Sequence, residues 1–509
     1  MRMNWRIALI WACCAIRLLF YASMLPLWEG FDEWAHFGVI RATAHGALLP
    51  ARDTRISRDV EASLHAAPLP WALRQLPSPS VTHDDFWQLS QAERDARRAA
   101  FQSIPRAWAN ENGELPAYET QQPPLYYWLM APVLAMMRGL SLADQVMVLR
   151  WASALLASLT IPLVYAIGRR VFESEGLAIA CAAIVSVMPG FAIDVARVGN
   201  DGISVALYGA LIWLGLQWID LGRRALWIGI VLGLGLLAKA YLLTAIPAVA
   251  ALFLLRRGRW YGVAAAMLGG WWYLRNLLTH GSLSGLTESA MPASGAGMWR
   301  HAFAISWPRA IDSALFTHIY TGGWSMLTVR SWIYHLFYVA AAVAAIGLVR
   351  VARRSRVLWL LAIYAAFWAG AFYDILLLFV TRGVATSMGY YLYAVVAAEA
   401  PLAVAGFGRW AAAGFLALFA ALDLYTVHAI EIPYYTGIIR HKAGNALAAV
   451  HVGDYRALGF GAVWDRLAMF KDHLASPPLL IALWIAYLAA TILLIGVAGR
   501  ELFRFKRGV

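Results

Sequence analysis

The sequence has few charged residues, few cysteines and no evident internal repeat. Asp, Glu, Lys and Arg make up only 14% of the 509 residues, whereas roughly a quarter is usual in soluble globular domains. The three cysteines all lie within apolar runs and are spaced neither as a disulfide framework nor as metal ligands. Low-complexity tracts and a soluble tail domain are also lacking. These absences exclude an ordinary soluble domain and a disulfide-stabilised one.

The chain is rich instead in long apolar runs. Hydrophobic residues make up 61% of it, and its mean hydropathy is +0.60. Many runs approach the roughly 20 residues of helix that cross a bilayer, and aromatic residues gather at their ends, as at membrane interfaces. We therefore predict an all-α polytopic membrane protein with about twelve transmembrane helices. The predicted spans are Ile7–Leu27, Leu149–Ile167, Leu177–Val195, Ile203–Trp218, Leu226–Ala238, Tyr241–Leu255, Tyr261–Leu277, Trp332–Val349, Val357–Val380, Ser387–Phe407, Ala411–Ala429 and Leu479–Val497.

Basic residues set the expected orientation. The net charge is 42 − 29 = +13, but the arginines form short clusters beside the spans, which indicates cytoplasmic loops rather than nucleic-acid binding. Twelve spans with both termini in the cytoplasm place every short cluster on the cytoplasmic side. A thirteenth span at Pro124–Leu140 would place most clusters outside, so we predict that this segment is interfacial or re-entrant. The N-terminal run contains Arg17 and no small-residue cleavage site, so we expect it to remain as the first span.

The same topology predicts three segments on the outer side, residues 28–148, 279–331 and 430–478. The first is long and charged, and it reads as amphipathic helices such as Ser90–Arg98. Long loops escape the positive-inside rule, so its arginines do not contradict the topology. We divide the chain into residues 1–290, which include the first outer loop, and residues 291–509, which carry the remaining spans and the other two outer loops.

An acidic run from Glu29 to His36 follows the first span, at the outer water–lipid boundary. Asp32 and His36 are four residues apart and would share one helical face. Ionisable groups this near the hydrocarbon are costly and tend to be kept for function, and a carboxylate in a partly dry site could act as a general base. The alternative is that Asp32 only N-caps a helix that begins at Glu33. The pattern alone does not decide between the two.

Four further polar segments face the same side in this topology. Taken singly, each has a simpler explanation, as a turn, a snorkelling lysine or an aromatic belt. Taken together, they place several cations near the acidic run: Arg197, Lys239 and Arg275, with Arg382 as a further candidate. Cations there suit a lipid-linked phosphate, and a carboxylate suits an incoming nucleophile. The segments are Tyr118–Tyr127, Val195–Gly202, Gly233–Tyr241 and Trp271–Gly281.

These runs resemble GT-C glycosyltransferases, the superfamily that includes protein O-mannosyltransferases (family 39) and the bacterial lipid A aminoarabinose transferases. Phe31–Gly38 is similar to the Phe-Asp-Glu-x-His-Phe-Gly run of the mannosyltransferases, and Gln122–Trp128 resembles their His-Pro-Pro-Leu segment. The chain departs from the pattern in three places. Gln122 replaces the common His, the insert Asp53–Glu114 is longer and more charged than usual, and Gly389–Leu392 (Gly-Tyr-Tyr-Leu) stands where many relatives have Gly-Arg-Tyr. The remaining similar runs are Arg150–Arg170, Met188–Gly190 with Asn200-Asp201, Gly235–Lys239 and Trp272–Asn276.

The resemblance implies a GT-C fold with juxtamembrane helices in the first outer loop. It also implies an inverting transfer of a sugar from a polyprenyl phosphate to an acceptor hydroxyl, on the periplasmic face of the bacterial inner membrane. By that analogy the catalytic residues are Asp32, as the base, and Glu33 beside it. Glu33 and His36 would orient the base or bind sugar. The implied substrate-binding residues are His36, Gln122, Arg197, Asp201, Lys239, Arg275 and His280.

No metal or other cofactor is required by this chemistry, because polyprenyl phosphate is already a tolerable leaving group. Some relatives bind a divalent metal, and Asp32, Glu33 and His280 could supply ligands for one. The expected partners are the sugar-lipid, membrane lipids, and an acceptor that is a glycan, a lipid or a protein; nucleic acid is not expected.

The alternative function is a lipid-linked sugar transporter or a non-catalytic lipid-binding membrane protein. A transporter would place ionisable groups near the midplane, within internal repeats. Only Arg17 and Asp374 lie deep in predicted spans, which is too few for a transport pathway.

Overall fold

The computed structural model describes residues 4–74, 76, 80–222, 224–254, 259–291, 295–442 and 446–504, without the side chains of residues 259–262, 264, 265 and 296. Its described elements are helices apart from one two-stranded antiparallel sheet, β1 (Arg55–Ser57) with β2 (Asn112–Pro116). Seven of the described helical segments are long and apolar enough to cross a membrane, or up to eight if one bent pair counts as a span. The predicted all-α polytopic fold is therefore confirmed.

The twelve predicted spans all fall on helical segments, but the segments are divided differently. The helix α18 (Val396–Thr426) has a break at Gly408, whose φ is 72°, between the predicted spans Ser387–Phe407 and Ala411–Ala429. The α12 helix (Ala225–Ala238) is short, and α13 (Ile246–Leu254) follows a turn of 3₁₀ helix, so neither qualifies as a full span by length. The other helices in the bundle are α1 (Trp5–Met24), α7 (Leu142–Ser158), α8 (Thr160–Val171), α9 (Glu175–Ser186), α10 (Pro189–Val195), α11 (Asp201–Leu221), α14 (Arg259–His280), α16 (Ser331–Leu348), α17 (Ser355–Arg382) and α22 (Pro477–Leu502).

The segment predicted to be interfacial or re-entrant forms α6 (Leu125–Met136), a helix of 12 residues. At about 1.5 Å per residue it is about 18 Å long, whereas a hydrocarbon core is about 30 Å thick. It packs against α2 (Glu33–Ala44) and α12 rather than crossing the bundle. This length agrees with the prediction that the segment does not span.

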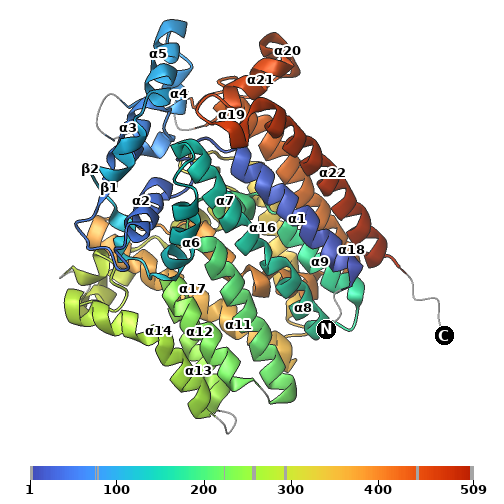
Figure 1. Ribbon diagram of the computed structural model, residues 1–509. Helices are drawn as coiled ribbons and strands as arrows, with labels where there is room; N and C mark the ends of the chain where they lie inside the picture. Colours follow the sequence, from blue (N-terminus) through green and yellow to red (C-terminus); the bar gives the residue numbers. More distant parts are fainter. Residues whose placement is uncertain are drawn as a thin grey trace.

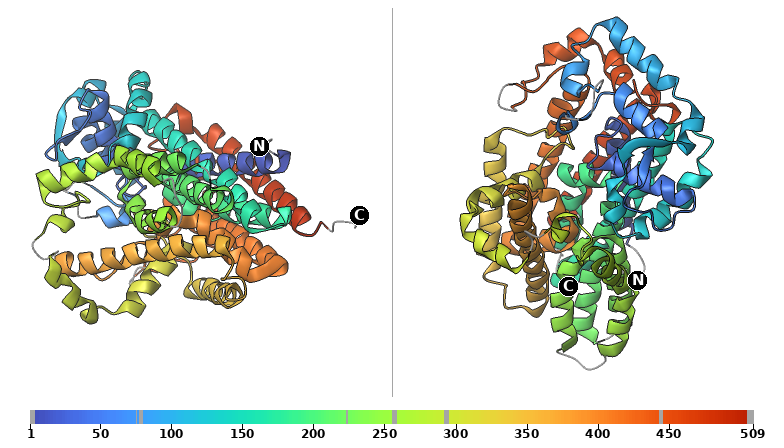
Figure 2. Two further views of the ribbon diagram at one scale, coloured as in Figure 1. Left: turned by 90° about the horizontal axis from the view of Figure 1, so that it is seen from below. Right: turned by 90° about the vertical axis from the view of Figure 1, so that its left-hand side faces the viewer.

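The first and third predicted outer segments gather at one end of the bundle (Figures 1 and 2). Trp87 donates from its indole to the carbonyl of Tyr435, and Asp84 pairs with His441, so the two segments are in contact. The ends of α1 and α22 that lead to the termini lie at the opposite end (Figure 1). The elements at the first end are α3 (Arg58–Ala66), α4 (His83–Phe86), α5 (Gln91–Gln102), the 3₁₀ turn η3 (Tyr118–Gln121), α19 (Ile432–Tyr435), α20 (Val452–Leu458) and α21 (Phe460–Leu467).

A buried ion pair joins helices in the bundle. Arg17 of α1 donates to Asp423 of α18 at 2.7 Å, and its Nε donates to the carbonyl of Ser186. The side chains of Arg17 and Asp423 are almost fully buried. Charges in such surroundings persist when they are paired and hydrogen-bonded. Arg17 therefore has a structural explanation as a link between helices. Asp423 lies within the predicted span Ala411–Ala429, so the expectation that only Arg17 and Asp374 lie deep in spans was wrong.

Candidate functional site

Asp32 lies in the turn between α1 and α2, in the left-handed backbone region, with φ 57°. Asp is one of the few residues that tolerate this region. It stands at the N-cap position of α2, but its side chain makes no capping hydrogen bond. Its Oδ1 accepts from the hydroxyl of Tyr118 at 2.6 Å instead. The sequence left two roles for Asp32 open, as an N-cap or as a functional carboxylate, and this geometry favours the functional carboxylate.

Glu33 has a different environment from its neighbour. Its side chain is fully buried, and Arg150 of α7 donates to its two oxygens at 2.7 and 2.6 Å. The backbone N–H of Val198 donates to the same carboxylate at 2.9 Å. Arg150 also donates to carbonyls at the C-terminal end of α1, including that of Leu25 at 2.8 Å. These contacts favour Glu33 as an anchor for the Asp32 turn rather than as a proton-transfer group.

The predicted phosphate-binding cations Arg197 and Lys239 lie in one buried network. Arg197 donates to Asp194 at 2.9 Å and to Asp201 at 2.5 Å, and it also donates to the carbonyl of Phe31. Lys239 donates to the other oxygen of Asp201 at 2.5 Å. The structure thus brings Arg197, Asp201 and Lys239 together beside the acidic run. It also pairs both cations with carboxylates, which the sequence did not indicate.

Gly30 explains how closely Arg197 approaches the turn. A Cβ at this position would lie 2.5 Å from the Cβ of Arg197. Only glycine therefore fits here without a shift of the arginine.

Gln122 and His36 complete the inner site, together with Glu119. Gln122 accepts from the amide of Asn200 at 3.3 Å, and that amide also donates to the carbonyl of Ala238, the residue before Lys239. The Nδ1 of His36 lies 2.9 Å from the hydroxyl of Tyr127, and its Nε2 lies 3.8 Å from Oε2 of Glu119. Glu119 is not among the site residues predicted from the sequence. It lies in the Tyr118–Tyr127 segment, but a buried carboxyl group there has no signature in the pattern.

Burial and neighbouring charges shift the pKa values of these groups. Burial raises the pKa of the Asp32 carboxyl group, and the Tyr118 hydrogen bond and the charges of Arg197 and Lys239 oppose that rise. Burial and the charge of Asp32 raise the pKa of Glu119 to about 8. Burial, with the charges of Arg197 and Lys239, holds the pKa of His36 well below its usual value. At neutral pH these shifts favour the neutral form of the His36 imidazole and of the Glu119 carboxyl group.

Aromatic rings cover one side of the site. Tyr390 stacks on Phe31, with ring centroids 4.3 Å apart, and the guanidinium of Arg197 lies 5.8 Å from the Tyr390 ring. Tyr391 packs against Tyr390 and Tyr241. The Gly-Tyr-Tyr-Leu departure therefore stands at the site, where it presents tyrosine rather than arginine.

The remaining predicted site residues, Arg275 and His280, form a separate cationic group. The guanidinium of Arg275 lies 5.0 Å from the ring of Trp272. Burial, and then the charges of Arg52 and Arg275, lower the pKa of His280. Within the described part of the chain, neither residue has a contact with Asp32. Two contacts join this group to the Gln122 segment: a 3.4 Å hydrogen bond from Thr287 to Gln121, and stacked rings of Trp128 and Trp271 with centroids 6.4 Å apart.

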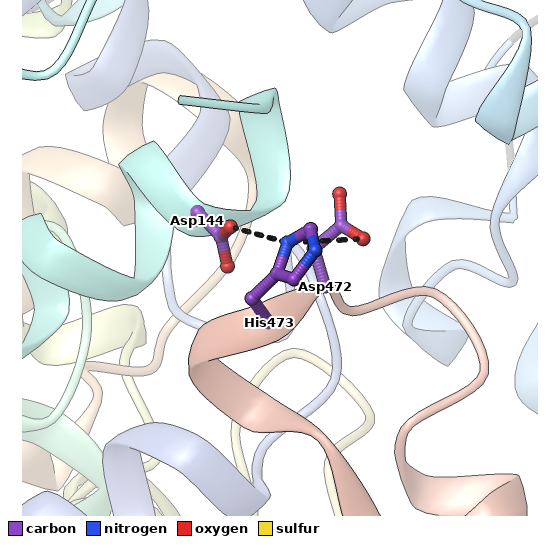
Figure 3. Close-up of side chains that lie close together, drawn as sticks. All are labelled: Asp144, Asp472 and His473. Atoms are coloured by element: carbon purple, nitrogen blue, oxygen red, sulfur yellow. Dashed lines mark ion pairs between the residues drawn. The ribbon is translucent and has the colours of Figure 1, made fainter. Parts of the chain in front are cut away.

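The trio considered as metal ligands does not fit a metal. Glu33 is held by Arg150, and His280 lies with the separate cationic group, so only Asp32 is at hand. Another set, Asp144 with Asp472 and His473, could hold a cation (Figure 3). Asp144 already accepts from the backbone N–H of Leu474 at 2.9 Å and lies 3.5 Å from His473. Those contacts explain the set as an anchor of the third outer segment on α7.

Comparison with known proteins gives one family. Residues 121–279 match the profile of the dolichyl-phosphate-mannose-protein mannosyltransferases. A search of curated protein sequences gave no match. Among solved structures, the crystal structure of ArnT from Cupriavidus metallidurans bound to undecaprenyl phosphate is similar at 14% identity, over 97% of this chain and 77% of that one, with a TM-score of 0.48. A similarity that low carries no argument about substrate. The profile match agrees with the resemblance drawn from the motifs within residues 121–279, and the Phe31–Gly38 run lies outside the matched residues.

Proposed function

We propose that this protein is an inverting glycosyltransferase that moves a sugar from a polyprenyl phosphate to an acceptor hydroxyl. The observation that carries the proposal is the Asp32 carboxylate. It is held at the bundle end in a strained backbone conformation, forms no helix cap, and lies beside paired cations. Strain of this kind costs about 1–3 kcal/mol and is concentrated at functional sites.

In this mechanism Asp32 accepts the proton of the acceptor hydroxyl as its oxygen attacks the anomeric carbon. The bond from that carbon to the phosphate oxygen breaks, and the polyprenyl phosphate leaves with the electron pair. A single displacement of this kind inverts the anomeric configuration. Tyr118 orients the base through its hydrogen bond, and positioned general bases contribute typically about 10²–10⁴-fold to rate.

The donor phosphate would be met by two groups of cations. Arg197 and Lys239 are already neutralised by Asp194 and Asp201, so they shape the site more than they add positive charge. Arg275 and Arg52 carry no carboxylate partner among the described residues and offer unneutralised charge, whereas the lowered pKa of His280 leaves its imidazole neutral at neutral pH. Guanidinium groups match phosphate oxygens bidentately. We therefore assign the larger share of phosphate binding to Arg275 and its neighbours.

The proposal places the site on the periplasmic face of a bacterial inner membrane, with both termini in the cytoplasm. The support is the charge distribution: in the predicted topology the short arginine clusters all flank the spans on the cytoplasmic side. The turn between α1 and α2 lies at the end of α1 away from the N-terminus (Figure 1).

The test is sugar transfer by purified protein in nanodiscs. Wild type, Asp32→Asn and the matched control Asp53→Asn, an exposed aspartate of the same outer segment, receive a panel of polyprenyl-phosphate sugars with membrane extract as acceptor source. We expect wild type and the control to release polyprenyl phosphate, and Asp32→Asn to lose at least about 100-fold in rate. Full activity of a folded Asp32→Asn variant would refute the mechanism. Binding of a sugar-lipid with no turnover in any variant, across several extracts, would favour a carrier.

A further inference from the structure

Glu119 is a buried acid that the proposed reaction does not yet use. Its side chain is 6% exposed, and its Oε2 has no hydrogen-bond partner among the described residues. It follows Tyr118, whose hydroxyl donates to Asp32, so the two carboxyl groups belong to one short stretch of the site. The carboxyl group has a side-chain hydrogen bond with Gln122, but an ionised carboxylate with one buried oxygen unpaired is still unfavourable. A carboxyl group placed this way is more stable with its proton on.

The hydrogen bonds around His36 indicate the same state. The hydroxyl of Tyr127 donates to the backbone carbonyl of Glu119, at 3.3 Å. The Tyr127 oxygen is then free to accept, so the proton of the neutral His36 ring lies on Nδ1, which is 2.9 Å away. The Nε2 lone pair is left facing Oε2 of Glu119 at 3.8 Å. A lone pair opposite an ionised carboxylate is repelled, whereas a protonated carboxyl group turns its O–H toward it.

The charges of the site leave room for one ionised acid in this pair. Arg197 and Lys239 are already matched by Asp201 and Asp194. If Asp32 and Glu119 were both ionised, two further negative charges would face a donor that brings its own phosphate. Neighbouring carboxyl groups in low-dielectric sites commonly avoid this by sharing one proton.

We propose that Asp32 and Glu119 hold one proton between them at neutral pH, with the proton on Glu119 and the charge on Asp32. Glu119 is thus a positioning residue: it keeps Asp32 ionised as the single base and keeps the site open to an anionic donor. The inference rests on the proposed glycosyl transfer.

When Glu119 loses its proton at alkaline pH, we expect the affinity of the site for the donor to fall. Burial and the charge of Asp32 raise the pKa of Glu119 to about 8, so above this pH a second negative charge develops beside the donor phosphate. We expect kcat/KM for the donor to fall about tenfold per unit of pH above the pKa, through KM rather than kcat. The groups that face Glu119 and could contribute to such a profile are Asp32, His36, Tyr118, Tyr127, Arg197, Asp201 and Lys239.

The discriminating variant is Glu119→Gln, which keeps the shape and the neutral state. We expect it to lose the alkaline fall, so that its kcat/KM stays level from pH 7 to pH 9 relative to its own value at pH 7. Glu119→Asp, which can still ionise, should keep an alkaline fall. The exposed Glu114→Gln of the same segment is the matched control and should behave as wild type. An alkaline fall that is the same in wild type and Glu119→Gln, or absent from wild type, would overturn the inference.

A second measurement is independent of turnover. A buried acid whose folded-state pKa is raised stabilises the protein fully below its unfolded-state pKa, and that stability is lost as pH rises through the folded-state pKa. The melting temperature of wild type in detergent should therefore decline more steeply than that of Glu119→Gln between about pH 5 and pH 8. Equal slopes would refute the protonated state of Glu119. If wild type transfers no sugar but the slopes differ, the proposed function fails while the protonation state stands.

Discussion

The ion pair between Glu33 and Arg150 gives the sharpest prediction on how the Asp32 turn is held. Glu33→Gln keeps an acceptor for Arg150 but removes the charge that neutralises it. Arg150→Met removes the donor and leaves Glu33 ionised, with the backbone N–H of Val198 as its remaining donor. It also removes hydrogen bonds to three carbonyls at the end of α1, those of Ala22, Leu25 and Pro26.

The expected magnitudes follow from this difference. Breaking a buried ion pair by removing one partner typically costs about 3–5 kcal/mol, because the other charge is left buried and unpaired. We expect Arg150→Met to lie at the upper end of this range, since it also frees the carbonyls. Glu33→Gln should lie at the lower end, since its amide oxygen still accepts from Arg150. The double variant should be less destabilised than the sum of the two single variants.

Thermal and denaturant unfolding in detergent would measure the stabilities, with sugar transfer measured on the same samples. A matched control is Glu111→Gln, which breaks the exposed pair with Arg58 and should cost no more than about 1 kcal/mol. If Glu33→Gln folded with wild-type stability and yet lost all transfer, Glu33 would be a catalytic acid or base. Its role as an anchor of the Asp32 turn would then be refuted. Additive losses in the double variant would refute the pairing itself.

Two further predictions concern the same turn. Tyr118→Phe removes the hydrogen bond that lowers the pKa of Asp32, so the acid limb of the pH–rate profile should move to higher pH. We also expect a loss of about tenfold in kcat at neutral pH. An unmoved acid limb would show that Tyr118 does not contact the base in solution. Gly30→Ala places a Cβ 2.5 Å from the Cβ of Arg197, so it should destabilise the fold by about 1–3 kcal/mol and reduce transfer. The control is Gly139→Ala, where the added Cβ meets nothing within 4 Å and neither effect is expected. Equal unfolding curves for the two variants would contradict the close approach.

The fold was predictable where a single helix crosses the bundle and less so where helices break. Continuous apolar runs such as Ser331–Leu348 can be predicted from their length and hydropathy. The break at Gly408 lies between the predicted spans Ser387–Phe407 and Ala411–Ala429, where Arg409 interrupts the apolar run. The 3₁₀ turn Ala240–Ala245 has no such signal, because it lies inside a continuous apolar run. The capping box of α5, in which Ser90 and Glu93 bond to each other's backbone N–H groups, was encoded locally and agrees with the amphipathic helix expected there.

The candidate site was predictable in its members but not in its pairings. The sequence indicated Asp32, Arg197 and Lys239 because ionisable groups at a membrane boundary are costly. Whether each one is available to a ligand depends on partners far away in the chain. Glu33 meets Arg150 across 117 residues, and Lys239 meets Asp201 across 38. Neighbouring residues with the same charge, Asp32 and Glu33, therefore have opposite roles, and nothing in the local pattern separates them.

These pairings change the expected electrostatics of phosphate binding. A buried cation already bonded to carboxylates attracts an anion only weakly, because the field of the pair falls off faster than that of a single charge. The inner network of Arg197, Asp201 and Lys239 is such a set. Its value to the reaction is then rigidity: it fixes the carbonyl of Phe31 and hence the direction of Asp32. Arg52 and Arg275 have no carboxylate partner among the described residues, and Arg275 lies next to exposed apolar residues of α14 such as Leu274 and Leu278. If the proposed donor enters from the lipid, its polyprenyl chain would lie along that face and its phosphate beside those two arginines.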